Sequence, residues 1–232
     1  MSDKKRIRLI TFLALYVAIY VVLKYIGDLI PIFNMPNGGS VEVELIAVCL
    51  ASYHLGWKGG AMTGLLSWLV TIVLGFVMYF VHPVQIALDY VLPLVVCGLA
   101  SLFGNYVDRG RKEQGLLSAA RALFIFGGII LSFGYSMHVI VIASAIAVAV
   151  FGVSFWYITN NTYFGIISSF FLKYFFTVLS GAYFWAEGAA AGSVAAWSFS
   201  LMYNLGYNLV SMIVCAIIVP VMADRIIKIA RI

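Results

Sequence analysis

The stretch His82–Tyr90, HPVQIALDY, places a carboxylate, Asp89, beside an aromatic side chain, Tyr90. Apolar sequence continues on both sides, from Gly60 to Val81 and from Val91 to Phe103, so Asp89 is expected at membrane depth. A carboxylate there costs free energy unless it meets a partner, and such residues usually mark a ligand or ion pathway. We favour a functional role; the alternative is a structural pair with a buried cation or with backbone donors.

A second line of polar side chains occurs in the apolar run Tyr163–Trp185. Lys173, Thr177, Gly181 and Trp185 recur every four residues, which places them roughly along one face of a helix. A lysine, a hydroxyl, a gap and an indole in one line predict the lining of a site. The alternative is a lysine whose ammonium group reaches the membrane interface.

More polar and aromatic side chains are expected at the outer ends of the same helices. Tyr79 and Gln85 lie near the start of the fourth span, and the last span begins with Phe199, Tyr203 and Asn204. Aromatic faces together with a carboxylate bind organic cations, and amide side chains suit a heteroaromatic ring with both donors and acceptors. The implied ligand is a small, flat, positively charged heterocycle taken from outside.

Two carboxylates precede the second apolar run. Glu42 and Glu44 have i,i+2 spacing, which points them to different faces of a helix, so at most one is expected to face a central site. Glu42 is expected in interfacial water. Glu44, one turn deeper, is the better candidate.

The sequence favours no catalytic and no metal site. An aspartyl protease needs two carboxylates that share a proton, and Asp89 has no second deep aspartate. There is no GxSxG elbow with a placed histidine and no GxxxxGK[ST] loop for ATP hydrolysis. His82 is expected to cap a helix before Pro83, and Cys49, Cys97 and Cys215 are expected to be small buried residues. We expect neither an enzyme nor a cofactor.

The composition places these residues in a membrane protein. The chain is 64% hydrophobic, with a mean hydropathy of +1.06. Its basic residues flank the apolar runs, which follows the positive-inside rule and predicts no nucleic-acid partner. Both termini and a mid-chain loop are therefore expected in the cytoplasm, with an even number of crossings. The basic residues that flank the apolar runs are Lys4, Lys5, Arg6, Arg8, Arg109, Arg111, Lys112, Arg121, Arg225, Lys228 and Arg231.

The spans form an expected all-α integral membrane bundle with one domain, residues 1–232. Ala14 and Ala18 form a small-xxx-small pair in the first span, suited to a close helix contact or to ordinary packing. The sequence of residues 121–171 is compatible with six membrane crossings in total or with eight. Eight crossings would include an extra hydrophobic hairpin at 121–157. The expected spans are Ile7–Ile26, Val43–Tyr53, Gly60–Phe80, a fourth from His82, Tyr163–Trp185 and Ser198–Ala223.

Four separated motifs resemble, in the same order, those of the thiamine-specific substrate-binding (S) components of energy-coupling factor (ECF) transporters. The likeness covers most of the chain except about residues 121–171. The motifs are PNGGS at Pro36–Ser40, HPVQ followed by LDY at His82–Tyr90, LKYFF…SG…FW at Leu172–Trp185, and FSLMYN at Phe199–Asn204.

The resemblance implies a six-helix protein of the bacterial cell membrane that binds thiamine in an outward-facing pocket. Uptake would require a transmembrane coupling protein and two ATPase subunits, and the coupling protein would dock at Ala14 and Ala18. Glu44 sits where the family often has an acidic residue. The resemblance also assigns pocket positions to Asp89, Tyr90, Tyr79, Lys173, Gly181, Trp185 and Asn204.

Three positions depart from the family pattern. Thr177 stands where members usually have histidine, Phe199 where they usually have tyrosine, and Ser40 where some have tryptophan. The loss of one ring and one hydroxyl leaves open a related ligand, such as hydroxymethylpyrimidine or another thiamine-like base.

Overall fold

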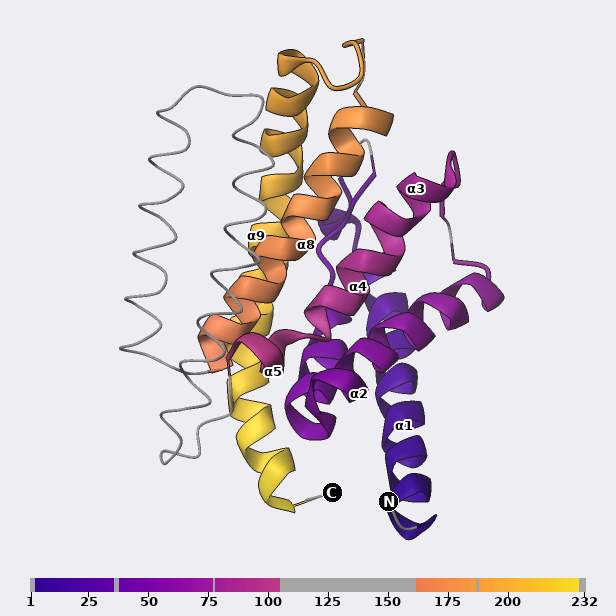
Figure 1. The fold of residues 1–232 in the computed structure, drawn as a ribbon, viewed down its shortest axis with the longest axis vertical. Coiled ribbons are helices and arrows are strands. Elements are labelled where there is room, and N and C mark those ends of the chain that lie inside the picture. The colour runs from indigo at the N-terminus through magenta and orange to yellow at the C-terminus, as the bar shows by residue number, and fades with distance from the viewer. Residues whose placement is uncertain (1–2, 36–37, 77, 105–161, 187, 230–232) are drawn as a thin grey trace.

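The computed structural model describes residues 3–35, 38–76, 78–104, 162–186 and 188–229, and these form helices joined by short loops (Figure 1). They contain no β-strand, only an isolated bridge between Asn34 and Ser40. The all-α expectation is confirmed, and the proposed extra hairpin at 121–157 lies outside the described residues. The helices are α1 (Asp3–Asp28), η1 (Pro31–Phe33), α2 (Leu45–Val73), α3 (Pro83–Ile86), η2 (Ala87–Val91), α4 (Leu92–Cys97), α5 (Ala100–Phe103), α8 (Thr162–Phe184) and α9 (Val194–Ile229).

Helix α1 contains the expected first span and packs chiefly against α2. Tyr16 and Tyr20 are buried in this contact and belong to the main hydrophobic core. Ala14 and Ala18 lie on the opposite, exposed side. The small pair therefore does not serve packing within the described part of the chain.

Helix α2 changes direction at Gly56, whose backbone (φ 80°, ψ 167°) is not helical. This break falls inside the turn that the sequence predicts between the second and third spans. The third span is shorter than expected, because the helix ends at Val73 rather than near Phe80. Gly75 (φ +74°) ends it in the left-handed conformation, and the Phe76 N–H donates back to the Thr71 carbonyl, a common glycine stop.

The helical segment Pro83–Cys97, which comprises α3, η2 and α4, carries Asp89 near its centre. His82 caps its start by accepting a hydrogen bond from the Val84 N–H at 3.2 Å, which confirms the expected role of this histidine. Residues Ala87–Val91 form a π-helical turn between α3 and α4. Such turns are rare and commonly lie at functional sites. Asp89 is thus at an irregular point of an otherwise continuous helix.

Helices α8 and α9 lie side by side along most of their length (Figure 1). Gly181 permits this, because a Cβ atom there would meet the Ser200 hydroxyl and would lie 3.1 Å from Asn204 Nδ2. The close approach brings the polar residues of both helices to one place.

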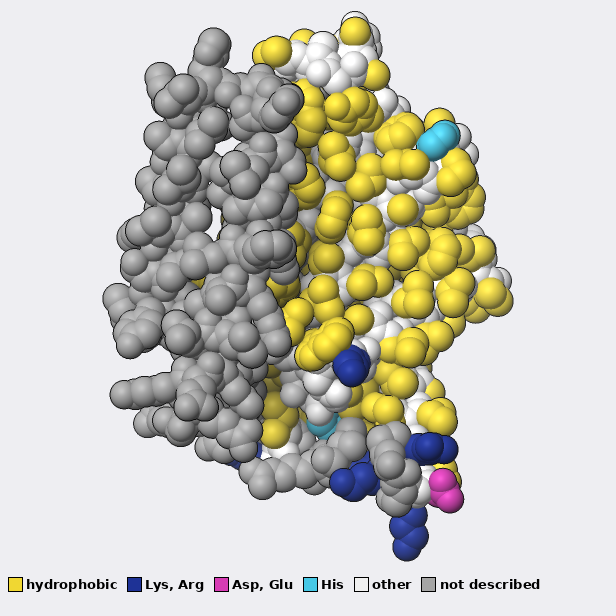
Figure 2. All heavy atoms as spheres, in the orientation of Figure 1, with side chains coloured by type: hydrophobic (Ala, Val, Ile, Leu, Met, Phe, Trp, Pro, Cys, Tyr) yellow, Lys and Arg dark blue, Asp and Glu magenta, His cyan; other side chains and the backbone are white. Residues whose placement is uncertain are grey.

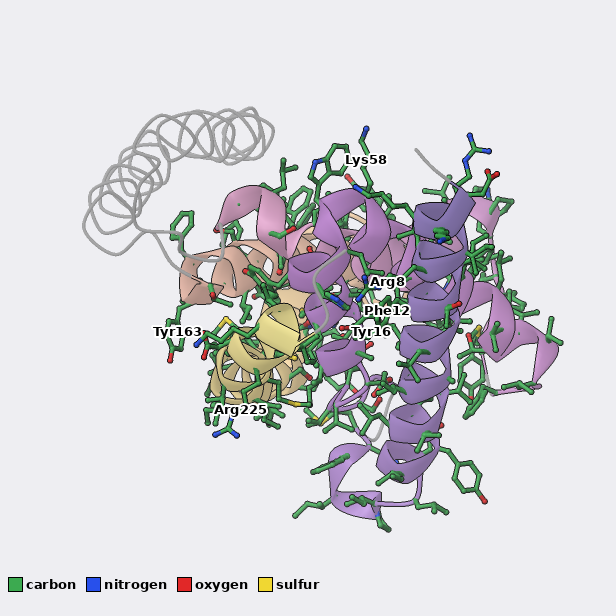
Figure 3. All side chains as sticks on the ribbon, turned by 90° about the horizontal axis from the view of Figure 1, so that it is seen from below. Arg8, Phe12, Tyr16, Lys58, Tyr163 and Arg225 are labelled. Carbon is green, nitrogen blue, oxygen red and sulfur yellow. The ribbon has the colours of Figure 1, made fainter. Side chains whose placement is uncertain are left out.

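Three described helices are long and apolar enough to cross a membrane: α1, α8 and Val194–Lys228 of α9. Figure 2 shows hydrophobic side chains over the visible face, with Lys and Arg gathered at the lower end. In the view from below, Arg8, Lys58 and Arg225 mark this end (Figure 3). The molecule therefore has one basic end. The N-terminal end of α1 and the C-terminal end of α9 lie at this end (Figure 1).

Candidate ligand-binding site

The Asp89 carboxylate accepts hydrogen bonds from neutral donors only. Its Oδ2 atom receives the Gln85 Nε2–H at 2.7 Å and the Trp185 indole N–H at 2.8 Å. Gln85 is fully buried, and its other amide atom accepts from the Val81 N–H at 3.2 Å. Among the described residues no lysine, arginine or histidine lies within 4.0 Å of Asp89 as an ion-pair partner. The carboxylate is thus held by two neutral donors.

Aromatic rings lie beside this carboxylate, at the end of the site that points away from the basic end of the molecule, the outer end. Tyr79 and Trp185 make an edge contact with ring centroids 6.4 Å apart. The Tyr90 hydroxyl receives the Tyr79 N–H at 2.9 Å and donates to the Tyr79 carbonyl at 3.3 Å. Tyr79 is 63% exposed and Trp185 37% exposed, so both rings present surface toward the outside. The structure thus brings together four of the sequence-predicted residues, Asp89, Tyr90, Tyr79 and Trp185.

The Lys173 side chain is fully enclosed, with 1% exposure. Its ammonium group pairs with Glu42, donates to Asn208 Oδ1 at 2.5 Å and lies 5.4 Å from the centre of the Tyr207 ring. Lys173 therefore does not reach the membrane interface. The expectation that it faces the interior of the bundle is confirmed.

Glu42, not Glu44, is the carboxylate of this inner group. The Glu42 side chain is 25% exposed and reaches Lys173, while its N–H donates to the Ser211 hydroxyl of α9 at 2.9 Å. Glu44 pairs instead with Lys24 of α1 at 3.6 Å. The expectation that Glu44 faces the central group is wrong, because Glu44 has helical φ/ψ (−62°, −22°) directly before α2 and points to α1, whereas Glu42 lies before this first turn and reaches α8.

Thr177, Asn204 and Asn208 connect α8 to α9 beside Lys173. Asn208 Nδ2 donates to the Thr177 hydroxyl at 3.3 Å and to the Asn204 carbonyl at 2.8 Å. The Asn204 amide group donates to the Ser200 carbonyl at 2.8 Å, and its oxygen accepts from the Tyr207 hydroxyl. Each amide is less than a tenth exposed. The inner end of the group is thus a closed network of neutral donors and acceptors around one ion pair.

Phe199 and Ser40 lie at the edge of this arrangement. Phe199 is 39% exposed and stacks on Tyr203, with ring centroids 5.5 Å apart. The Tyr203 hydroxyl donates to the Gly38 carbonyl at 2.8 Å, which ties the loop before α2 to α9. Ser40 bridges to Asn34 within that loop. Phe199 therefore contributes a partly exposed aromatic ring at this edge but no hydroxyl group.

The arrangement has two ends of different chemistry. At the outer end, the Asp89 carboxylate, which has no ion-pair partner among the described residues, lies beside aromatic rings. At the inner end, Glu42 and Lys173 neutralise each other among amides and hydroxyls. The described residues contain no cluster of three histidine, cysteine, aspartate or glutamate side chains that could hold a metal ion. This geometry suits a ligand with a cationic ring at one end and a neutral polar ring at the other.

Three members of the inner group were not among the predicted site residues: Glu42, Tyr207 and Asn208. For the last two a signal exists, because Tyr203, Asn204, Tyr207 and Asn208 alternate phenols and amides at helical spacing in an otherwise apolar span. For Glu42 the signal is the polar, glycine-containing stretch before it, which argues against a helical start.

The comparisons with known proteins agree with this picture. The family model for thiamine transporter protein (Thia_YuaJ) matches residues 10–156 and 141–230. Thiamine transporter ThiT of Bacillus subtilis (strain 168) is 29% identical over 232 residues, which cover 98% of this chain and 97% of that protein. A solved structure of ThiT from Listeria monocytogenes has a TM-score of 0.60 at 19% identity and covers 97% of both chains, which shows the same fold. The chain is a transporter rather than an enzyme, and it belongs to the thiamine transporter (Thia_YuaJ) family.

Proposed function

We propose that this membrane protein is the substrate-binding subunit of a thiamine importer and that it captures thiamine from the outside. The observation that carries the proposal is Asp89, a half-buried carboxylate that has only neutral partners among the described residues. A charge in such a place is stabilised by a counter-ion, and here the ligand supplies it. The rings of Trp185, Tyr79 and Tyr90 add attraction for a flat cation through their faces.

Thiamine matches the two ends of the site. Its thiazolium ring carries a permanent positive charge and fits beside Asp89 and Trp185. Its aminopyrimidine ring is neutral and has both donors and acceptors, which suits the amides and the Glu42–Lys173 pair. With thiamine bound, the ligand cation balances Asp89 and the inner pair balances itself, so no net charge remains in the site.

Delivery into the cell needs partners. The sequence has no phosphate-binding loop of its own, so an ECF coupling protein with two ATPase subunits would supply the energy. The exposed pair Ala14 and Ala18 on α1 offers a flat face for that contact. The basic end of the molecule would lie in the cytoplasm, with both termini, and the site would open to the outside of the cell membrane.

The test is a fluorescence titration of the purified, detergent-solubilised protein with thiamine. The Trp185 indole contacts Asp89 directly, so saturable quenching by thiamine that disappears in Trp185→Ala is expected. Trp197, which packs on Tyr183 near the outer end, supplies the matched control, since Trp197→Phe should retain the response. Quenching by hydroxymethylpyrimidine but not by thiamine would overturn the thiamine assignment and identify a precursor as the ligand.

A further inference from the structure

A second ion pair lies on the other side of the stretch that carries Glu42. Lys24 of α1 lies 3.6 Å from Glu44 and 2.9 Å from Asp28. Its ammonium group is also 5.9 Å from the centre of the Phe76 ring. Glu44 is only 3% exposed and, although it precedes the first residue of α2, its carboxylate makes no capping hydrogen bond to that helix. Within the described residues Lys24 is its ion-pair partner.

Residues 42–44 therefore join two parts of the molecule. On one side, Glu42 reaches Lys173 of α8 through its carboxylate and Ser211 of α9 through its N–H. On the other side, two residues along, Glu44 reaches α1. The backbone between them is a turn whose carbonyl groups accept from the first N–H groups of α2: Leu45 donates to Glu42 at 3.4 Å and Ile46 to Val43 at 3.2 Å. Backbone hydrogen bonds thus join this turn to α2, and its two carboxylates join it to α8 and α1.

We propose that the Lys24–Glu44 ion pair is a positioning contact that holds Glu42 in place for the inner end of the ligand. An enclosed carboxylate is stabilised by its cation, so the pair fixes the Glu44 end of the turn against α1. Without that anchor, the turn keeps its backbone link to α2 but loses its contact with α1, and Glu42 loses its fixed distance from Lys173. Lys24 and Glu44 thus act on ligand binding without contact to the ligand.

This inference rests on the proposed function and predicts which ligands are affected. Thiamine should use both ends of the site, whereas an N-methylthiazolium compound without the pyrimidine ring should use only Asp89 and the aromatic rings. Glu44→Gln is therefore expected to weaken thiamine binding about fivefold, within the range of coupling between neighbouring residues, and to leave thiazolium binding unchanged. Asp28→Asn is the matched control, because Asp28 also pairs with Lys24 but its side chain is 41% exposed.

The decisive experiment is a double-mutant cycle between Glu44→Gln and Glu42→Gln, read as thiamine affinity by tryptophan fluorescence. In the Glu42→Gln background, Glu44→Gln should change affinity less than twofold, because the residue it positions is already neutral. Lys24→Met should repeat the effect of Glu44→Gln, and Lys24→Arg should retain affinity because it keeps the cation.

Equal losses in both backgrounds, or equal losses for thiamine and the thiazolium compound, would overturn the inference in favour of general destabilisation. If Glu44→Gln does not fold, the comparison of Lys24→Met with Lys24→Arg decides in its place. Thiamine that fails to bind the unaltered protein would overturn the proposed function itself, whereas thiamine binding with additive losses overturns only the positioning role.

Discussion

The two ends of the site hold their carboxylates in opposite ways. Asp89 accepts from an amide and an indole and has no cation beside it in the described structure, while Glu42 is paired with the enclosed Lys173. The first arrangement leaves a carboxylate without an ion-pair partner in the described residues, and the second pairs a carboxylate inside the protein. The difference implies that the outer end contributes to ligand binding more than to folding, and that the inner end contributes to both.

The largest expected effect comes from breaking the inner pair. Lys173→Met leaves Glu42 without its cation in a nearly closed network, and loss of one partner of a buried pair destabilises a protein by about 3 kcal/mol or more. Thermal unfolding of the detergent-solubilised variant should show a clearly lower midpoint. The double variant Lys173→Met/Glu42→Gln should recover much of the loss. A single variant as stable as the original would show that the pair does not support the fold.

Asp89→Asn should separate binding from folding. The change keeps the shape of the side chain and removes the charge that pairs with the ligand, which should weaken thiamine binding roughly 100-fold, or about 3 kcal/mol. Thermal stability should stay close to that of the original protein, because its partners here are neutral donors. Calorimetric titration measures the affinity. Unchanged binding would contradict the role of Asp89 and the comparison built on it.

A smaller effect is expected from the indole N–H. Trp185→Phe keeps an aromatic face but removes one of the two hydrogen bonds to Asp89 Oδ2, which should cost about 1 kcal/mol, or roughly fivefold in thiamine affinity. Trp185→Ala removes the face as well and should cost more. Equal effects of the two variants in the same titration would mean that the hydrogen bond matters and the ring does not.

The smallest effect on binding is expected on α1. Ala14→Trp or Ala18→Trp adds bulk to an exposed face far from both carboxylates, so thiamine affinity should be unchanged. Uptake of labelled thiamine by cells that express the whole ECF module should be abolished, because the docking face is blocked. Uptake that survives both changes would contradict the docking role of this face.

Sequence reasoning worked where periodicity controls structure. The every-fourth spacing of Lys173, Thr177 and Gly181 did predict one helix face, because α8 is regular over its whole length. Hydropathy located the first span, the span Tyr163–Trp185 and the last span, and Pro83 located a helix start. It failed at Glu42 and Glu44, because which of the two carboxylates reaches Lys173 depends on contacts with α1, α8 and α9. No local pattern encodes those contacts.

The role of Asn208 also depends on tertiary structure. Its amide meets Lys173 and Thr177 only because α8 and α9 approach closely beside Gly181, and the register of two helices cannot be read from either one. Asp89 was identified for a different reason. A charged residue in an apolar run stands out in the sequence, whichever residues it contacts in the folded protein.

The π-helical turn at Ala87–Val91 has a consequence for how the fourth helical segment can change. One extra residue in a turn rotates everything after it by about 100° around the helix axis. The π turn therefore sets the angle between Asp89 and the packing residues of α4, Leu94 and Cys97, which face the core. The helix can keep its fit to α2 and α8 while the ligand-facing turn varies in sequence. A single-residue deletion in this turn, in contrast, would force either the packing face or the carboxylate out of place.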